Sequence, residues 1–181
     1  MRVAITGAHG VGKSTLAEEL SEVLAVPVLS TPGRTLAARG LPVNEDATVA
    51  SQSVAWLLQY RFERDQPAWV TPRSLVDVWA YTVQASRRAA PTPLEAALLE
   101  ELERSTPLAV AERYDHLIYI PPRIELQADD VRPSGEAFQR ATDEAIVGAL
   151  AQWSIPHTEL DVLDRSAVQA VIDRLAADAD A

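Results

Sequence analysis

The chain of 181 residues contains no cysteine, which excludes disulfide bonds, thiolate metal sites and a cysteine nucleophile. No apolar run approaches the length that crosses a bilayer. The first residues enter a strand pattern at once and leave no room for a signal peptide, so a cytoplasmic protein is expected. Basic residues are scarce, because 16 Lys and Arg stand against 26 Asp and Glu, a formal net charge of -10. This balance counts against a surface built for nucleic-acid phosphates, although it is compatible with one local basic groove.

The chain does contain enough apolar sequence, 48% of its residues, to bury the core of one domain spanning residues 1–181. Strand and helix patterns alternate along it, which predicts an α/β fold in three layers. The central parallel sheet is expected to have five strands, with helices on both of its faces. These strands are predicted near residues 2–6, 26–29, 68–70, 116–120 and 157–160.

The most specific pattern is the run from Gly7 to Thr15, which satisfies G-x-x-x-x-G-K-[ST] between a strand pattern and a helical one. Glycines let successive backbone N–H groups point inward, and the following helix N-terminus adds positive potential there. Lys13 is expected to reach the β- and γ-phosphates of ATP, and the Ser14 hydroxyl to ligate Mg²⁺. The predicted nucleotide-binding residues are Gly7, His9, Gly10, Val11, Gly12, Lys13, Ser14 and Thr15. For His9, both a spacer role and a phosphate contact stay open.

Two further turns are expected to face the same crevice, because parallel strands place ligands at their carboxyl ends. Ser30 to Arg34 follow the second predicted strand, and Thr71 to Ser74 follow the third. Arg34 and Arg73 are therefore candidate substrate-binding residues, with a solvated arginine as the alternative for Arg34. Asp77 comes one helical turn after Ser74.

The segment 123–135 mixes charges with prolines and shows no sustained periodicity, which is typical of a functional, lid-like loop. It carries Arg123 and Arg132. An ion pair between Arg132 and Asp129 or Asp130 is the alternative to a role in phosphoryl transfer.

Five stretches make the chain resemble the P-loop nucleoside and nucleotide kinases. Within these it is most similar to the nicotinamide-riboside-kinase-like ATPase group, which is related to thymidylate kinases. The stretches are residues 7–15, 31–34, 70–75 with Asp77 and Tyr81, 114–122 and 129–132. The resemblance implies ATP- and Mg²⁺-dependent phosphoryl transfer, with Arg132 reaching toward the transferred group. GTPases of this class usually carry N-K-x-D, which this sequence lacks.

The chain departs from that pattern at two positions. Such kinases commonly have an acidic residue three positions before the arginine, where this chain has Thr31, and Asp-Arg-Ser where it has Pro72-Arg73-Ser74. Neither residue supplies a carboxylate to orient an acceptor hydroxyl or to order Mg²⁺.

Three explanations stay open for the missing carboxylates. Asp77 would replace the lost charge, with Glu63 as a weaker candidate and a purely structural role for Asp77 as the alternative. Otherwise the acceptor is a phosphate, which needs no general base, or the protein binds a nucleotide and does little chemistry. The arginines available to clamp an acceptor phosphate are Arg34, Arg73, Arg123 and Arg132.

The sequence thus favours a kinase that transfers the γ-phosphoryl group of ATP to a nucleoside, nucleotide or similar metabolite. Its predicted catalytic residues are Lys13, Asp77, Arg73 and Arg132, with Arg34, Arg73 and Arg123 at the acceptor and Ser14 at the metal. The alternative is a regulatory nucleotide-binding ATPase or a catalytically degraded relative. A kinase acting on a modified base in nucleic acid is a third reading, against which the net charge counts. The expected partners are a nucleotide and a small-molecule acceptor, with no membrane, and the oligomeric state stays open, a homodimer included.

Overall fold

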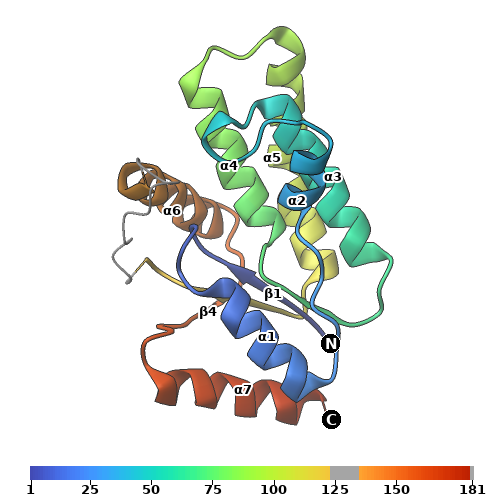
Figure 1. Cartoon of the computed structure of the whole chain (residues 1–181), viewed down its shortest axis with the longest axis vertical. Coiled ribbons are helices and arrows are strands. Elements are labelled where there is room, and N and C mark those ends of the chain that lie inside the picture. The colour runs from blue at the N-terminus through green and yellow to red at the C-terminus, as the bar shows by residue number, and fades with distance from the viewer. Residues whose placement is uncertain (123–134, 180–181) are drawn as a thin grey trace.

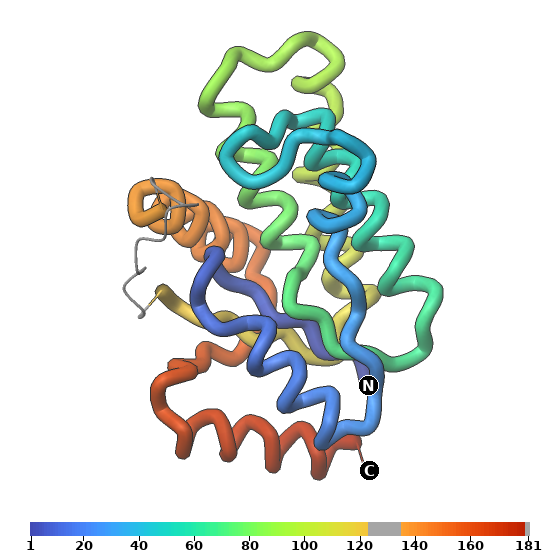
Figure 2. Tube along the Cα trace, in the orientation of Figure 1, coloured from blue at the N-terminus to red at the C-terminus, as the bar shows by residue number. Residues whose placement is uncertain are grey.

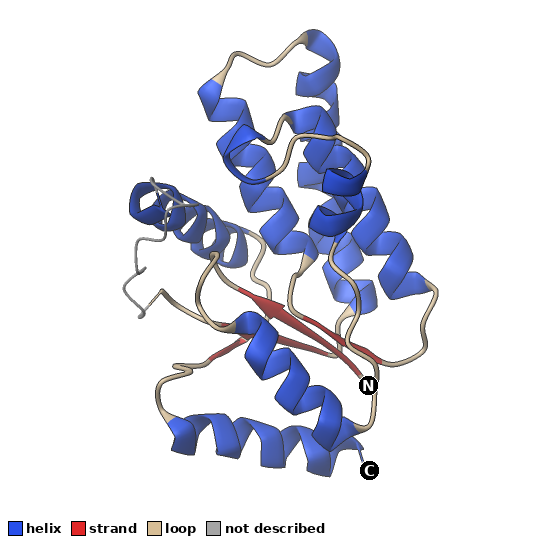
Figure 3. Cartoon of the chain, in the orientation of Figure 1, coloured by secondary structure: helices blue, strands red, loops and turns tan. Residues whose placement is uncertain are grey.

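The structure is a computed structural model, which describes residues 1–122 and 135–179. Within these residues, one parallel sheet has four strands in the order β2-β1-β3-β4 (Figure 3). The strands are β1 (Arg2–Thr6), β2 (Trp69–Thr71), β3 (His116–Tyr119) and β4 (Thr158–Glu159). The helices are α1 (Lys13–Leu24), α2 (Pro32–Ala38), α3 (Val49–Arg64), α4 (Leu75–Arg88), α5 (Pro93–Arg113), α6 (Gly135–Gln152) and α7 (Arg165–Ala179), with a 3-10 turn η1 (Asn44–Asp46).

Helices flank the sheet on both sides, which confirms the expected α/β fold with a parallel sheet. Helices α1 and α7 lie along one side, although they come from opposite ends of the chain, and α3 to α6 gather on the other (Figures 1 and 2). Strand β1 contributes side chains to two hydrophobic cores, one on each face of the sheet. Val3 and Ile5 pack with α1 and α7, whereas Ala4 packs in the core formed with α3 to α6. None of the described helices is long and apolar enough to cross a membrane.

The prediction of five strands is wrong for the described residues, because the segment 26–29 does not form one. Only Val28 pairs with Val70, as an isolated parallel bridge. The carbonyl of Pro27 accepts a hydrogen bond from Val70 N, and Leu29 N donates to Val70 O. Pro27 has no N–H of its own, so the ladder does not extend toward the N-terminus of the segment. The bridge nevertheless aligns this segment with the edge of the sheet.

Helix α5 is longer than its sequence pattern indicates. A helix ending near Arg104 and a restart at Thr106 are expected from Pro107, but one helix runs through the proline. Thr106 is fully buried, donates to the carbonyl of Leu102 and accepts a hydrogen bond from Trp56 Nε1 of α3. Tertiary packing on this face therefore offsets the backbone hydrogen bond that Pro107 cannot make.

The carboxyl ends of β1, β2 and β3 meet at one edge of the sheet. Register pairs Ala4 with both Thr71 and Leu117, so the three strands end within a few residues of one another. The glycine-rich turn follows β1, and the turn that carries Arg73 follows β2. The expectation that these two turns share one crevice edge is consistent with this register.

Candidate functional site

The turn between β1 and α1 is shaped by glycines. Gly7 has φ +150° and Gly12 has φ +89°, conformations that side chains with a Cβ rarely adopt. A Cβ on Gly7 would also lie 2.6 Å from the carbonyl oxygen of Ile120, because the end of β3 packs directly against this turn. Ser14 and Thr15 are exposed in the first turn of α1. The N-terminal N–H groups of α1 and these two hydroxyls thus suit an anionic ligand and its metal ion.

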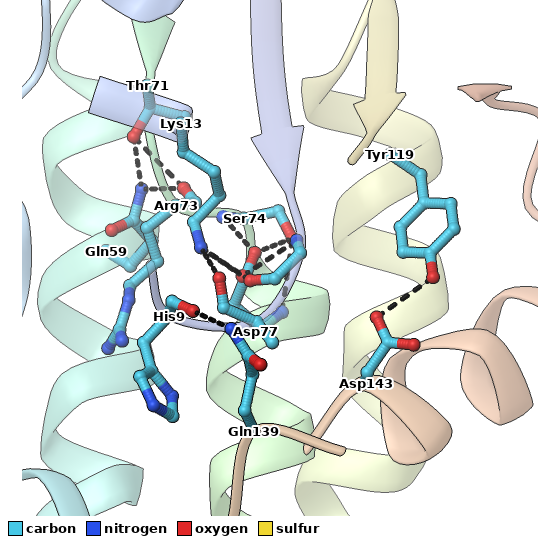
Figure 4. A network of polar contacts seen from close by, with 12 residues as sticks. His9, Lys13, Gln59, Thr71, Arg73, Ser74, Asp77, Tyr119, Gln139 and Asp143 are labelled. Carbon is cyan, nitrogen blue, oxygen red and sulfur yellow. Dashed lines mark hydrogen bonds and ion pairs between the residues drawn. The ribbon is translucent and has the colours of Figure 1, made fainter. Parts of the chain in front are cut away.

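Lys13, the only lysine of the chain, lies inside this turn. Its Nζ donates hydrogen bonds of 2.5 Å to the carbonyls of Gly7 and Ala8. The same Nζ lies 3.9 Å from Oδ1 of Asp77, which comes from α4 (Figure 4). The Lys13 side chain is only 13% exposed. The ammonium group is therefore held at the turn rather than extended into solvent.

Burial lowers the pKa of Lys13 to about 8, because the charged ammonium loses hydration. The carboxylates of Asp77 and Asp143 oppose this shift, whereas the positive charge of Arg73 adds to it. Lys13, Arg73 and two carboxylates therefore share one electrostatic environment. At neutral pH most Lys13 side chains keep their proton and their charge.

Asp77 joins the start of α4 to the glycine turn. Its Oδ2 accepts hydrogen bonds from the N–H and the hydroxyl of Ser74, each 2.7 Å long, and Asp77 N donates to Ser74 Oγ. This reciprocal capping box fixes the rotamer of the carboxylate. Its Oδ1 then accepts a hydrogen bond from Gly7 N at 3.2 Å. Asp77 is 1% exposed, and its carboxylate faces Gly7 N and Lys13 while it also caps α4.

Arg73 lies on the other side of Lys13 from Asp143 (Figure 4). Its guanidinium carbon is 4.7 Å from the centre of the Tyr81 ring, a cation–π contact. Tyr81 in turn meets the ring of Phe138 edge to face, with 5.6 Å between the ring centres. Among the described residues, no carboxylate forms an ion pair with Arg73. The guanidinium is thus oriented by an aromatic ring and keeps its capacity to bind an anion.

Helix α6 contributes residues that the sequence patterns did not indicate. Gln139 Nε2 donates a hydrogen bond of 2.7 Å to the carbonyl of His9, within the glycine turn. One helical turn later, Asp143 Oδ1 accepts a 2.9 Å hydrogen bond from the hydroxyl of Tyr119, at the end of β3. Burial raises the pKa of Asp143, while the Tyr119 hydrogen bond and the charge of Lys13 lower it. The only local signal is the spacing of four residues, which places Gln139 and Asp143 on one helix face.

Glu63 belongs to a buried hydrogen-bond network that reaches the backbone of Arg73 through Gln59. Its Oε1 accepts hydrogen bonds from Gln59 Nε2 at 2.7 Å and from the Tyr114 hydroxyl at 3.0 Å. Gln59 Nε2 also bonds the carbonyl of Arg73, and Leu75 N donates to the Tyr114 hydroxyl. Burial raises the pKa of Glu63 to about 8, against the effect of these hydrogen bonds. Through the Arg73 carbonyl and Leu75 N, the network fixes the backbone of the turn between β2 and α4.

Contacts with Lys13 are not found for Thr31 and Arg34, and two other predicted arginines lie outside the described residues. Thr31 precedes α2, and Arg34 is exposed on that helix. Arg123 and Arg132 lie outside the described residues, as does the lid-like segment apart from Gly135, the first residue of α6. Within residues 1–122 and 135–179, no three His, Asp or Glu side chains are grouped to hold a metal ion. A cation here would thus depend on Ser14 and on ligands that a bound nucleotide brings.

Comparison with known proteins supports the same fold. A family model described as an AAA domain (AAA_28) matches residues 2–165. A crystal structure of NadR protein in complex with NAD and AMP-PNP superposes with a TM-score of 0.71 at 16% identity, covering 99% of this chain and 49% of that one. This chain thus spans about half the length of that NadR chain. A comparison with curated proteins gives no match.

Two small-molecule kinases have the fold over their whole length. Deoxyadenosine kinase from M. mycoides with bound dCTP gives a TM-score of 0.68 at 14% identity, covering 98% of this chain and 100% of that one. Shikimate kinase from Bacteroides thetaiotaomicron gives 0.52 at 12% identity, covering 100% and 99%. At these identities the likeness establishes the fold, not the substrate. The resemblance to P-loop nucleoside and nucleotide kinases is confirmed at that level.

Proposed function

This chain belongs to the AAA domain family, and we propose that it is an ATP- and Mg²⁺-dependent small-molecule kinase. Its reaction transfers the γ-phosphoryl group to a nucleoside, nucleotide or similar metabolite, and the catalytic unit is the whole chain as one domain. The observation that carries the proposal is the position of Lys13, held in the glycine turn 3.9 Å from a buried carboxylate. The kinase fold of the solved neighbours supports it.

In this proposal the glycine turn and the start of α1 bind the ATP phosphates. The backbone N–H groups from Gly7 to Thr15 donate to phosphate oxygens, and Lys13 exchanges its carbonyl partners for the β- and γ-phosphates. Ser14 supplies a protein oxygen for Mg²⁺, which offsets phosphate charge when bound. His9 and Val11 shape the turn, since the His9 carbonyl bonds Gln139 and Val11 is buried.

Arginines are the proposed partners of the acceptor and of the transferred group. The Arg73 guanidinium lies over the ring of Tyr81, and its charge is close enough to lower the pKa of Lys13. Arg34, Arg123 and Arg132 complete the proposed set, with Arg132 acting on the transferred group. A guanidinium binds phosphate oxygens through two parallel hydrogen bonds, which gives orientation as well as charge.

Asp77 is proposed to act through Lys13 and the turn. Its carboxylate fixes Gly7 N and faces the ammonium group, so it sets where Lys13 returns when no phosphate is bound. This role makes Asp77 a positioning residue rather than one that touches the acceptor.

A second candidate function is nucleotide binding or regulatory ATP hydrolysis without an acceptor. It is favoured by the residues at two positions where kinases of this kind commonly carry acids, Thr31 and Pro72, neither of which supplies a carboxylate. A nucleic-acid acceptor has less support, given the formal net charge of -10.

The two candidates separate in one assay. The protein is incubated with ATP, Mg²⁺ and a panel of nucleosides, monophosphates and small alcohols, and ADP is measured. We expect ADP that depends on an acceptor and is lost in Lys13→Ala. Arg104→Ala, on the exposed surface of α5, is the control and should keep the activity. Slow hydrolysis without acceptor dependence would contradict the kinase proposal and support the regulatory one.

A further inference from the structure

Within the proposed kinase function, on which this step rests, we infer that the acceptor is a phosphate group rather than a hydroxyl. The substrate class is then a nucleoside monophosphate or a comparable phosphate monoester. The inference rests on how the described carboxylates near Lys13 are hydrogen-bonded, and on the lack of a carboxylate partner for Arg73 among the described residues. A hydroxyl acceptor needs a group to take its proton, whereas an ionised phosphate needs cations to overcome its repulsion from ATP.

Among the described residues, Asp77 is the carboxylate that lies within ion-pair distance of Lys13, and its hydrogen-bonding capacity is already used. Both Ser74 donors occupy Oδ2, while Gly7 N and the Lys13 ammonium face Oδ1. With 1% of the residue exposed, an acceptor hydroxyl would have to displace one of these contacts to reach it. Asp77 therefore does not suit the role of general base.

Two other carboxyl groups near the site, among the described residues, also have hydrogen-bond partners of their own. Glu63 is 1% exposed and accepts hydrogen bonds from Gln59 and Tyr114, and its raised pKa keeps it largely protonated at neutral pH. Asp143 accepts from Tyr119 and lies across Lys13 from Arg73 (Figure 4). The hydrogen bond of Asp143 is thus with the end of β3 and not with the turn that carries Arg73.

Arg73 is the feature that favours an anion. Its guanidinium is supported by the Tyr81 ring, has no carboxylate partner among the described residues, and lies near the charge of Lys13. Two neighbouring cations, one free to make two parallel hydrogen bonds, match the geometry of a phosphate monoester. The Gln59 hydrogen bond to the Arg73 carbonyl fixes the backbone from which this side chain extends.

The step balances without a base. An oxygen of the acceptor phosphate dianion forms a bond to the γ-phosphorus of ATP, and the bond from that phosphorus to the β,γ-bridging oxygen breaks. Its electron pair leaves with ADP, and the product is a phosphoric anhydride. No proton needs to be removed from the attacking oxygen, so the transfer does not depend on a carboxylate that acts as a general base.

The experiment uses matched pairs of acceptors with the full chain. Ribonucleosides, deoxyribonucleosides and nicotinamide riboside are each compared with their 5′-monophosphates under Mg-ATP, and ADP and the phosphorylated product are measured. We expect at least one monophosphate to give kcat/KM at least about a hundredfold above its nucleoside. The acidic limb of that rate should follow the acceptor's own second phosphate ionisation, near pH 6.

Arg73→Lys provides the variant readout, because lysine keeps the charge but loses the paired hydrogen bonds. It should raise KM for the monophosphate by about tenfold or more and change ATP affinity by less than about threefold. Arg104→Lys is the matched control and should change neither.

Two results would overturn the inference in distinguishable ways. Phosphorylation of a nucleoside with its monophosphate inert contradicts the phosphate acceptor but leaves the kinase function standing. In that event, loss of the activity in Asp143→Asn would identify Asp143 as the base. No acceptor-dependent ADP from any pair, with ATP binding intact, contradicts the proposed function and the inference with it.

Discussion

Oδ1 of Asp77 lies 3.9 Å from Nζ of Lys13, while Oδ2 of the same carboxylate caps helix α4 through Ser74. One side chain therefore connects the start of a helix to the only lysine of the chain. The capping box leaves the carboxylate one orientation, and that orientation aims it at the glycine turn. A structural requirement of α4 and the electrostatics of the nucleotide site are thus met by the same group.

The first prediction concerns Asp77→Asn. Both carboxylate oxygens accept hydrogen bonds, so the amide nitrogen of Asn must face a donor, either Gly7 N or the Ser74 groups. We expect a loss of about 1–3 kcal/mol in the free energy of unfolding, measured by urea denaturation. ATP affinity should fall, while kcat at saturating ATP and acceptor stays within about threefold of the wild type.

The matched control for that variant is Glu95→Gln, which alters the equivalent position of the exposed capping box of α5. It should weaken stability slightly and leave ATP affinity unchanged. A fall in kcat by orders of magnitude in Asp77→Asn at saturating substrates would instead assign Asp77 a direct role in phosphoryl transfer.

The second prediction is the pKa of Lys13, which a single-lysine chain makes directly measurable. Reductive methylation with ¹³C-formaldehyde labels this amine and the N-terminus, and NMR follows both against pH. The Lys13 signal should titrate near 8, against the ordinary value of 10.5, because burial disfavours the charged form. Asp77→Asn should lower this pKa further, and Arg73→Ala should raise it. In urea, where the chain is unfolded, the Lys13 midpoint should be near 10.5. The same midpoint in the folded protein would contradict the buried position of Lys13.

The fold could be predicted where local patterns are strong. The glycine run and the buried β1 pattern each specify structure within a few residues. The failures depend on partners far along the chain. The segment around Pro27 has strand composition but makes only one bridge, and Pro107 predicts a break that the burial of Thr106 overrides.

The site, like the fold, could be predicted only where the signal is local in the sequence. The spacing from Ser74 to Asp77 predicts a carboxylate that turns back from α4, and Asp77 faces Lys13 and Gly7 N; its role in the reaction stays a prediction. For Gln139 and Asp143 the one local signal is their spacing of four residues, which does not show what this face of α6 contacts. Their contacts with His9 and Tyr119 exist because the helix packs across the ends of β1 and β3, which is a tertiary relationship.

The third prediction concerns stability against pH through Glu63. Its pKa is raised from 4.5 to about 8 in the folded protein, so the folded state binds the proton more tightly than the unfolded chain. The contribution to stability is complete below pH 4.5 and is lost as pH rises through 8. Glu63→Gln keeps the acceptor oxygen for Gln59 and Tyr114 but does not ionise.

The measurement is urea unfolding at pH 5 and pH 9 for both proteins. Relative to the wild type, Glu63→Gln should gain roughly 3 kcal/mol between these two pH values, an order-of-magnitude figure from the size of the shift. Glu101→Gln, on the exposed face of α5, is the control and should show no such gain. Parallel pH profiles for the wild type and Glu63→Gln would contradict a buried, largely protonated Glu63.

The last prediction compares two glycines. In Gly7→Ala the new Cβ would lie 2.6 Å from the carbonyl oxygen of Ile120 at a φ of +150°, and neither backbone can move without disturbing β1 or β3. We expect a loss of at least about 2 kcal/mol in the free energy of unfolding, together with loss of ATP binding by the protein that remains folded. Gly148→Ala in α6 has open space around the same atom and should be neutral or stabilising by about 0.5–1 kcal/mol. Equal stabilities for the two variants would show that the end of β3 does not constrain the turn, and the close packing that positions Lys13 would lose its support.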